Sequence, residues 1–232
     1  MGKSFTRDDL TSPKGRRAAN WALMIGDHGL LRLFYDNSHE IAPQKLWRTY
    51  QPSESKLKSW KKRGIRTVIN LRGKTPAGHY VLEEEACERL ALTLVNFQVY
   101  SREAPAPSIV HGAIDLFKTI EYPAIMHCKS GADRAGLMGV LFRYCHQGKP
   151  LEESLEQLSF RYGHVRQGKT GILDFVFERF KSHAAKNNLN VDDCQNFLNW
   201  IDSPAYDPAT LKQEFVASWW GTALTEKILR RE

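Results

Sequence analysis

Short apolar runs alternate with longer amphipathic stretches through the middle of the chain. Three apolar runs predict buried strands, at residues 66–71, 93–100 and 124–128. Stretches with helical periodicity predict helices, at residues 54–63, 79–91, 107–120, 137–144, 151–162 and 172–180. Because a helix lies between each strand and the next, the pattern predicts an α/β fold with a mostly parallel central sheet flanked by helices.

The first predicted helix has a boundary signal at each end. Ser53 is a suitable N-cap for residues 54–63, and Gly64 is a suitable stop signal immediately after them. The strand at 66–71 then follows almost directly, which fixes the order of the first two elements.

The ends of the chain do not follow this alternation. Residues 1–20 are polar and basic and predict a mobile arm. Residues 16–35 mix apolar clusters with polar residues, which fits either a helix lying on an acidic membrane or a helix packed on the domain, and we favour packing. We expect three segments: a basic arm and amphipathic helical extension at 1–39, a main domain at 40–182, and a helical C-terminal extension at 183–232.

Composition and charge narrow the class of protein. With 232 residues and 42% hydrophobic content, the chain can bury a substantial core, which excludes a disordered or fibrous protein. The formal charge of +7 favours anionic partners, namely a phosphorylated substrate, an acidic membrane surface or nucleic acid. Since zinc-finger spacing and aromatic-basic ribonucleoprotein motifs are absent from the sequence, we expect no nucleic acid partner.

Cysteine usage and hydropathy bear on the compartment. Cys87, Cys128, Cys145 and Cys194 show neither paired metal spacing nor the density of a disulfide framework, which fits a reducing cytoplasm and argues against a metal. No apolar stretch approaches the ~20 residues needed to span a bilayer, and the start lacks the pattern of a secretory signal. We expect a cytoplasmic protein, with peripheral membrane contact as an additional candidate.

The residues with the clearest chemical meaning lie at 123–136. The apolar run there ends in His127 and Cys128, and Arg134 follows after five residues at the start of an apolar helix pattern. A loop of this length can curl so that its backbone N–H groups point inward and form an anion-binding nest at the helix N-terminus. The Cys128 sulfur would lie at the floor of this nest, where the N–H dipoles and the Arg134 guanidinium favour the thiolate.

The other residues of the loop suit a phosphate ligand. The planar guanidinium of Arg134 can bind two phosphoryl oxygens at once, and Gly131 allows a tight turn close to the ligand. Lys129 adds a second cation, which suits a substrate with more than one phosphate. The candidate phosphate-binding residues are Lys129, Ser130, Gly131, Ala132, Asp133 and Arg134.

Together, the buried strand, His127, Cys128 and Arg134 resemble the signature of the cysteine-dependent protein tyrosine phosphatase superfamily. Lys129 and Asp133 resemble its atypical dual-specificity and lipid or inositol-phosphate phosphatase branches. Residues 46–53 and 64–72 are similar to the opening of bacterial and fungal atypical dual-specificity phosphatases, so the resemblance runs from about residue 40 to about residue 180. It implies a dual-specificity phosphatase-like fold, with the phosphatase domain at 40–182.

The resemblance also implies a reaction. The Cys128 thiolate would attack phosphorus to form a phosphocysteine, which water then hydrolyses without a metal or any other cofactor. His127 precedes the nucleophile on the strand, and we interpret it as a support for the loop that acts from behind. The expected substrates are phosphotyrosine or phosphoserine proteins, phosphoinositides or inositol phosphates, and the sequence carries no signal of oligomeric state.

The general acid is less clear from the sequence. Family members commonly carry an Asp on the loop after the preceding strand, but no Asp occurs between Leu92 and Ile114. Glu103 and Asp133 are the two candidate acids, and either could instead form a structural salt bridge. We favour Asp133, because the loop fixes its position beside the phosphate.

Ala135 departs from the pattern of the family. Relatives usually carry Ser or Thr after the arginine, and its hydroxyl stabilises the thiolate. Its loss keeps a second hypothesis open, in which the chain is a catalytically weak phosphate-binding module. A sulfur-transfer or arsenate-reducing enzyme is a third hypothesis, which the lack of an obvious resolving cysteine pair disfavours.

Several cations outside the loop are candidate substrate-binding residues. Ligands of open α/β sheets bind beyond the carboxyl ends of the strands, where Arg72, Lys74 and Arg102 are expected. His164 and Lys169 lie in a basic segment that could close over the substrate or simply connect two helices.

Overall fold

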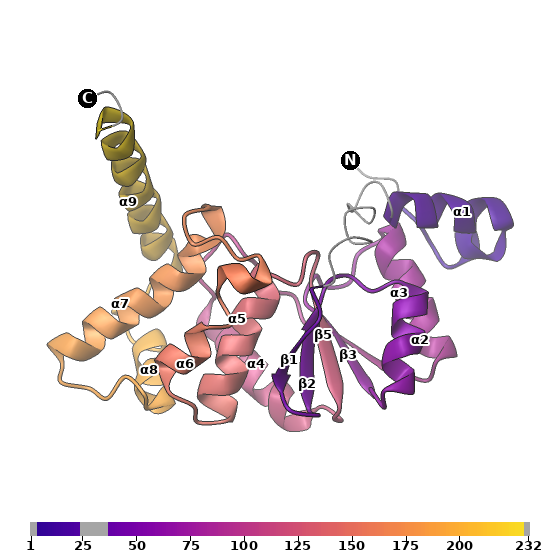
Figure 1. The fold of residues 1–232 in the computed structure, drawn as a ribbon, viewed down its shortest axis with the longest axis horizontal. Helices are drawn as coiled ribbons and strands as arrows, with labels where there is room; N and C mark the ends of the chain where they lie inside the picture. Colours follow the sequence, from indigo (N-terminus) through magenta and orange to yellow (C-terminus); the bar gives the residue numbers. More distant parts are fainter. Residues whose placement is uncertain (1–3, 24–36, 230–232) are drawn as a thin grey trace. The chain divides into compact units, whose positions relative to one another are not determined.

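The computed structural model describes residues 4–23 and 37–229, with side chains as far as residue 218 (Figure 1). These residues form two compact units. The first comprises residues up to 99 together with 119–135, and the second comprises residues 100–118 and those from 136 onward.

The first unit contains a five-stranded sheet with the order β1-β2-β5-β3-β4. The strands β2, β5, β3 and β4 run parallel, and β1 joins the edge antiparallel to β2. The fold is therefore α/β with a mostly parallel sheet, as predicted. The strands are β1 (His39–Ala42), β2 (Leu46–Thr49), β3 (Thr67–Asn70), β4 (Thr93–Asn96) and β5 (Ala124–His127).

Two strands, β1 and β2, were not predicted from the sequence. Each has only four residues, and β2 includes the polar residues Arg48 and Thr49, which are nevertheless fully buried. The register of β2 aligns its last residue with the last residues of two other strands, because Thr49 pairs with His127 and His127 pairs with Asn70. The carboxyl ends of three parallel strands thus lie in one row at the point where the chain leaves β5.

Two helices, α2 (Glu54–Lys62) and α3 (Gly78–Arg89), pack against one face of this sheet (Figure 1). Ser53 caps α2 by accepting a hydrogen bond from the Lys56 N–H at 3.3 Å, and Gly64 ends the turn after it with a φ of +88°. Both boundary predictions are confirmed. The buried residues of this layer are Leu57, Trp60, Ile65, Val68, Ala86, Cys87, Leu92 and Ile125.

The short helix α1 (Pro13–Trp21) follows a 3-10 turn (Asp8–Thr11) and packs on α3. Ala19 is fully buried in a cluster with Tyr80 and Val81, and Arg16 forms an ion pair with Glu85 at 2.6 Å. This confirms packing on the domain for the described part of the N-terminal extension. The remainder, residues 24–36, lies outside the described residues.

The second unit is helical. Its C-terminal helices enclose an aromatic core, in which the Phe177 and Phe197 rings stack at 5.4 Å and Trp200 meets Tyr206 edge-on at 4.9 Å. The helices are α4 (Pro107–Thr119), α5 (Asp133–Leu141, whose first turn belongs to the first unit), a π-helix (Phe142–His146), α6 (Leu151–Leu155), 3-10 turns (Phe160–Tyr162 and Lys169–Gly171), α7 (Ile172–Lys186), α8 (Cys194–Ile201) and α9 (Pro208–Leu229). Residues 183–232, predicted as a helical C-terminal extension, include the end of α7 together with α8 and α9.

The helix predicted at 151–162 is wrong in its length. It ends at Leu155, and the chain turns so that the buried Gln157 side chain packs on Gly139 of α5. A Cβ at position 139 would lie 2.9 Å from the Gln157 side-chain oxygen. Tertiary packing therefore sets the end of this helix.

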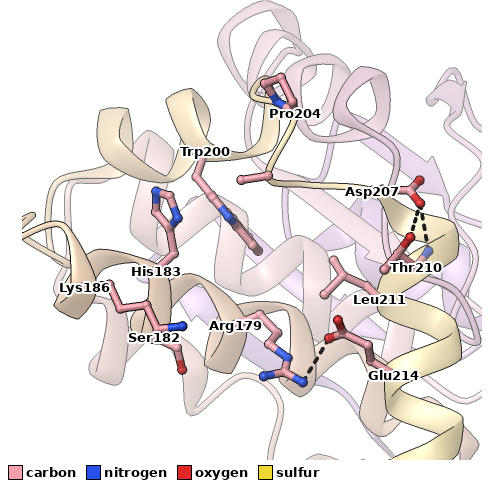
Figure 2. Close-up of a pocket in the computed structure, with 11 residues that line it drawn as sticks. Arg179, Ser182, His183, Lys186, Trp200, Pro204, Asp207, Thr210, Leu211 and Glu214 are labelled. Carbon is pink, nitrogen blue, oxygen red and sulfur yellow. Dashed lines mark hydrogen bonds and ion pairs between the residues drawn. The ribbon is translucent and has the colours of Figure 1, made fainter.

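A groove of about 310 Å³ lies between α7 and α9 (Figure 2). Within it, Arg179 forms an ion pair with Glu214 at 2.9 Å, and Asp207 accepts hydrogen bonds from Thr210 at the start of α9. These hydrogen bonds hold the pKa of Asp207 below its ordinary value. The ion pair between Arg179 and Glu214 joins α7 to α9.

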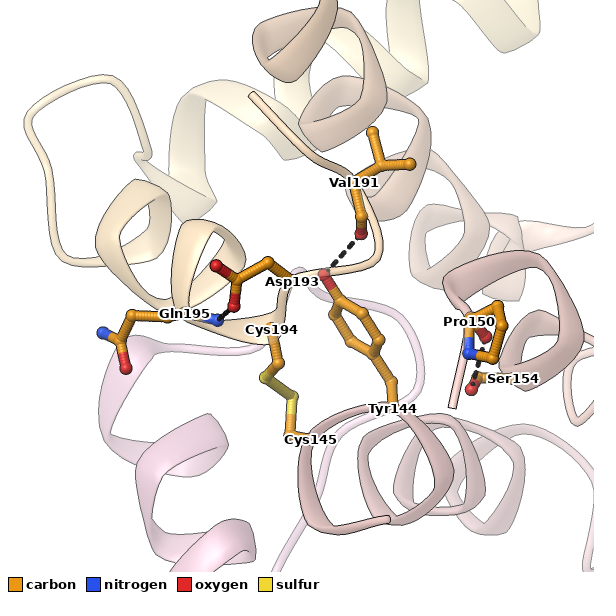
Figure 3. The surroundings of a disulfide bond; sticks show 8 residues. All are labelled: Tyr144, Cys145, Pro150, Ser154, Val191, Asp193, Cys194 and Gln195. Carbon is orange, nitrogen blue, oxygen red and sulfur yellow. Dashed lines mark hydrogen bonds between the residues drawn. A yellow bond between two sulfur atoms is a disulfide. The ribbon is translucent and has the colours of Figure 1, made fainter. Parts of the chain in front are cut away.

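A disulfide joins Cys145 of the π-helix to Cys194 at the start of α8 (Figure 3). The sequence had predicted no disulfide, and this expectation is wrong. The two cysteines are 49 residues apart, so their spacing gave no sign of the pairing. Cysteine usage consequently no longer supports the expectation of a reducing cytoplasm.

In the parts of the chain that the structure describes, no helix is long and apolar enough to cross a membrane.

Candidate active site

The loop that leaves β5 lies within the first unit and runs directly into α5. Gly131 forms its turn with a φ of +75°, a conformation that L side chains rarely adopt. The backbone of β2 also passes close behind it, since a Cβ at this position would lie 2.8 Å from the Thr49 carbonyl. The glycine is therefore required both for the conformation of the turn and for the close approach of the two segments.

Cys128 lies inside this turn and is 2% exposed. The Gly131 N–H donates a hydrogen bond to the Cys128 sulfur at 3.2 Å. The sulfur of Cys128 thus accepts a hydrogen bond from the backbone of its own loop.

The carbonyl groups of residues 128–132 are all held from outside the loop. Because N–H and C=O lie on opposite sides of a trans peptide, fixing these carbonyls outward directs the next N–H groups inward. This is the geometry of an anion-binding nest. The donors are the His127 ring to the Cys128 carbonyl (3.4 Å), the Gln51 N–H to Lys129 (3.3 Å), the Asn37 amide to Ser130 (2.9 Å), and Arg48 to Gly131 (2.7 Å) and Ala132 (2.5 Å).

Arg48 is the most unusual of these donors. It is a fully buried arginine on β2, and its guanidinium donates to the carbonyls of two successive loop residues. It also places a positive charge behind the loop, which favours an anion in front of it. Sequence reasoning missed this role, although a charged residue within the β2 segment was the available signal.

His127 supports the loop from the other side. Its ring is fully buried, and its Nδ1 atom faces the Cys128 carbonyl at 3.4 Å. Its Nε2 atom lies 2.6 Å from the Glu83 carboxylate on α3. Glu83 was missed, because it is one of three consecutive glutamates. The neighbouring Glu84 and Glu85 pair with arginines at partly exposed positions.

Four polar residues of the loop and the first turn of α5 are at least partly exposed. Arg134 is half-buried in the first turn of α5, and its guanidinium forms no ion pair with any residue for which the structure gives side chains. Asp133 and Lys129 are also half-buried, whereas Ser130 is exposed. The guanidinium is thus available for an anion bound by the loop.

Two cations expected at the strand ends have different surroundings. Arg72 donates to the Gln51 side chain at 2.8 Å, and the Gln51 N–H contacts the Lys129 carbonyl, so Arg72 lies at the edge of the loop. Lys74 is largely exposed, and its ammonium lies 3.9 Å from Glu84 on α3. Within the described residues, Arg72 is therefore linked to the loop through Gln51, whereas Lys74 contacts α3.

The remaining candidates belong to the second unit. Glu103 forms an ion pair with Lys212 of α9 at 3.1 Å, with both side chains about half exposed. His164 is 2% exposed and contacts Asp174 of α7 at 2.7 Å, so its ring holds the basic segment to α7 and is not presented to solvent. Arg102 and Lys169 are exposed.

Among the side chains of residues 4–23 and 37–218, no group of three or more His, Cys, Asp or Glu is placed to hold a metal ion.

Comparison with known proteins adds a family match. The sequence model of the family PTP-NADK, described as "DSP-PTPase phosphatase fused to NAD+ Kinase", matches residues 15–173. This range includes the whole cysteine loop and the elements that support it. A comparison with curated proteins gave no match.

Several solved structures have a similar fold. TpbA from P. aeruginosa is 17% identical over 58% of this chain and 80% of its own, with a TM-score of 0.49. A putative phosphatase from Neisseria meningitidis is 20% identical over 58% of this chain and 94% of its own, with a TM-score of 0.45. PTPMT1 is 14% identical over 64% of this chain and 99% of its own, with a TM-score of 0.46.

Proposed function

Because the chain belongs to this family of atypical dual-specificity phosphatases within the cysteine-dependent protein tyrosine phosphatase superfamily, we propose that it hydrolyses phosphomonoesters through a phosphocysteine. One observation carries the proposal. The Gly131 N–H is aimed at the Cys128 sulfur inside a loop whose five carbonyls are held outward.

The proposed reaction has two steps. The Cys128 thiolate attacks phosphorus, so that a P–S bond forms as the P–O bond of the ester breaks, and the leaving oxygen takes a proton from the acid. Water then attacks the same phosphorus and gives a proton back to that acid, and the P–S bond breaks as the thiolate leaves with its electron pair. Arg134 and the loop N–H groups bind the phosphoryl oxygens during both steps. The net products are an alcohol and inorganic phosphate.

Asp133 is the better candidate for the acid. It lies in the first turn of α5, one residue before Arg134, so the loop itself positions it beside the phosphate. Glu103 is engaged with Lys212 on α9, which fits the structural salt bridge that the sequence left open. The position of Asp133 beside Arg134 supports it as the proton donor in the first step.

The proposed substrates are phosphorylated proteins, phosphoinositides or inositol phosphates. Lys129 within the loop and Arg72 at its edge supply positive charge beyond Arg134, which suits ligands with more than one phosphate. We keep residues 40–182 as the proposed phosphatase domain and peripheral membrane contact as a prediction.

A turnover panel tests the function. The full chain is assayed in EDTA against phosphotyrosine peptides, phosphoserine peptides, phosphoinositides and inositol phosphates, with release of inorganic phosphate as the readout. We expect hydrolysis of at least one class, unaffected by the chelator. Tight binding of a substrate without any phosphate release would instead identify a phosphate-binding module and contradict the proposal.

A hydroxyl at position 135 is expected to raise turnover. Ala135 is fully buried next to Arg134, and a serine there would offer the leaving thiolate a hydrogen bond worth about 1 kcal/mol, or about fivefold in rate. Rapid-quench measurement of the phosphocysteine should show faster breakdown in Ala135→Ser than in the wild type. Ala135→Gly, which lacks the hydroxyl, is the control. An unchanged lifetime in both variants would contradict this explanation.

A further inference from the structure

Glu83 and His127 form a buried pair that the reaction steps above do not use. Both side chains are fully buried, and His127 Nε2 lies 2.6 Å from Glu83 Oε1. The contact is not aligned as a hydrogen bond, and no side chain in the described part of the chain donates a hydrogen bond to either carboxylate oxygen. A buried carboxylate in this state costs several kcal/mol unless a proton or a positive charge compensates it.

The contacts of the His127 ring indicate how many protons the Glu83–His127 pair carries. The Cys128 carbonyl is an acceptor only, so the His127 atom facing it, Nδ1, carries a proton. At 2.6 Å, Nε2 and Oε1 would repel each other as two unprotonated acceptors, so one of the two groups carries a further proton. Whether that proton belongs to the imidazole or to the carboxyl, the pair is neutral overall and the ring orientation is fixed.

The other titratable groups near Glu83 cannot provide this proton at neutral pH. Burial, with a further contribution from the Glu83 charge, raises the pKa of Cys87 to about 12. Burial and hydrogen bonding to Glu84 raise the pKa of Tyr80 to about 12, again with a smaller contribution from Glu83. Both stay protonated, so His127 is the partner on which the carboxylate depends.

We propose that Glu83 is a positioning residue for the nucleophile, on the premise that the proposed phosphatase function holds. Glu83 holds the His127 ring so that Nδ1 donates to the Cys128 carbonyl, and this contact sets the depth of the sulfur beneath the loop N–H groups. Helix α3 is thereby connected to the floor of the site through two side chains. Around metal-bound histidines, carboxylate partners that fix the ring typically contribute about 10- to 100-fold to affinity or activity, and we expect an effect at the lower end of that range for His127.

Two substitutions at position 83 test the proposal. Glu83→Leu removes the partner of Nε2, whereas Glu83→Gln offers an amide N–H that can donate to Nε2 while His127 keeps its Nδ1 proton. We expect kcat per folded molecule to fall about tenfold in Glu83→Leu with KM within about twofold, and Glu83→Gln to restore most of the rate. A loss as large in Glu83→Gln as in Glu83→Leu would overturn the proposal, as would wild-type kcat in both.

Glu85 provides matched controls on the same helix. Glu85→Leu and Glu85→Gln remove a partly exposed ion pair with Arg16 and should leave kcat unchanged. Thermal melting supplies the folded fraction for each variant.

A second readout does not need turnover. The rate of Cys128 alkylation by iodoacetamide, followed by peptide mass spectrometry, should change at least about threefold in Glu83→Leu and not in Glu85→Leu, because sulfur position and ionisation set thiol reactivity. Absence of wild-type turnover would refute the phosphatase function alone. Equal alkylation rates in the wild type and Glu83→Leu would refute the positioning role of Glu83.

Discussion

Replacement of Cys128 by serine is expected to abolish turnover while the loop still binds phosphate esters. A serine hydroxyl is not ionised near neutral pH and cannot form the thiophosphate bond, so kcat should fall by at least about 10⁴-fold. The Gly131 N–H can donate to a serine oxygen as it does to sulfur, and the outward contacts of the loop carbonyls do not involve this side chain. The measurements are kcat on the best substrate of the panel and calorimetric affinity for that substrate.

Cys87 is the matched control for this experiment. It is the other free cysteine of the described residues, it is buried in the layer between the sheet and α3, and burial raises its pKa to about 12. Cys87→Ala should therefore keep wild-type kcat per folded molecule. Residual hydrolysis by Cys128→Ser close to the wild-type rate would rule out Cys128 as the nucleophile.

The sequence predicted the reactive loop because its chemistry is local. His127, Cys128, Gly131 and Arg134 lie within eight consecutive residues, and the turn conformation of Gly131 follows from its residue type. The strands at 66–71 and 124–128 were predicted for the same reason, since short apolar runs carry their own periodicity. Features that depend only on neighbouring residues, such as this turn and these strands, could therefore be predicted from the sequence.

The residues that hold the loop carbonyls from outside could not be predicted in this way. Arg48 is a buried charge in a four-residue strand, and its burial is compensated by carbonyls that are 83 and 84 residues away in the sequence. A charged residue in a short apolar segment normally indicates an exposed position. Only the parallel pairing of β2 with β5 brings Arg48 to the loop.

The role of Glu83 could not be predicted from the sequence for a different reason. Three consecutive glutamates on one helix look equivalent in composition, yet only Glu83 is turned to the interior. Its spacing from the buried Tyr80 and Cys87, three and four residues, places it on their face of α3, and this was the signal that could have singled it out. The burial of those two neighbours became visible only with the sheet in place.

Replacement of Arg48 by methionine is expected to weaken both the fold and phosphate binding. The variant fills a similar volume but leaves the Gly131 and Ala132 carbonyls without their buried donor, which should cost about 3 kcal/mol. For a chain of this size that corresponds to a fall in Tm of about 10 °C. Without the outward donors, the loop N–H groups lose their fixed direction, so the affinity for orthovanadate should fall at least about tenfold among the folded molecules.

Two further substitutions separate the geometry of Arg48 from its charge. Arg48→Lys keeps the charge but has no planar fork to reach both carbonyls, so its Tm and vanadate affinity should lie between those of the wild type and Arg48→Met. Arg66→Met removes an arginine of the same unit whose ion pair with Glu121 is more than half exposed, and its free energy of unfolding should change by less than about 1 kcal/mol. If Arg48→Met kept wild-type vanadate affinity at a temperature where it is folded, the buried guanidinium would not organise the loop. The phosphate site would then depend on Gly131 and the start of α5 alone.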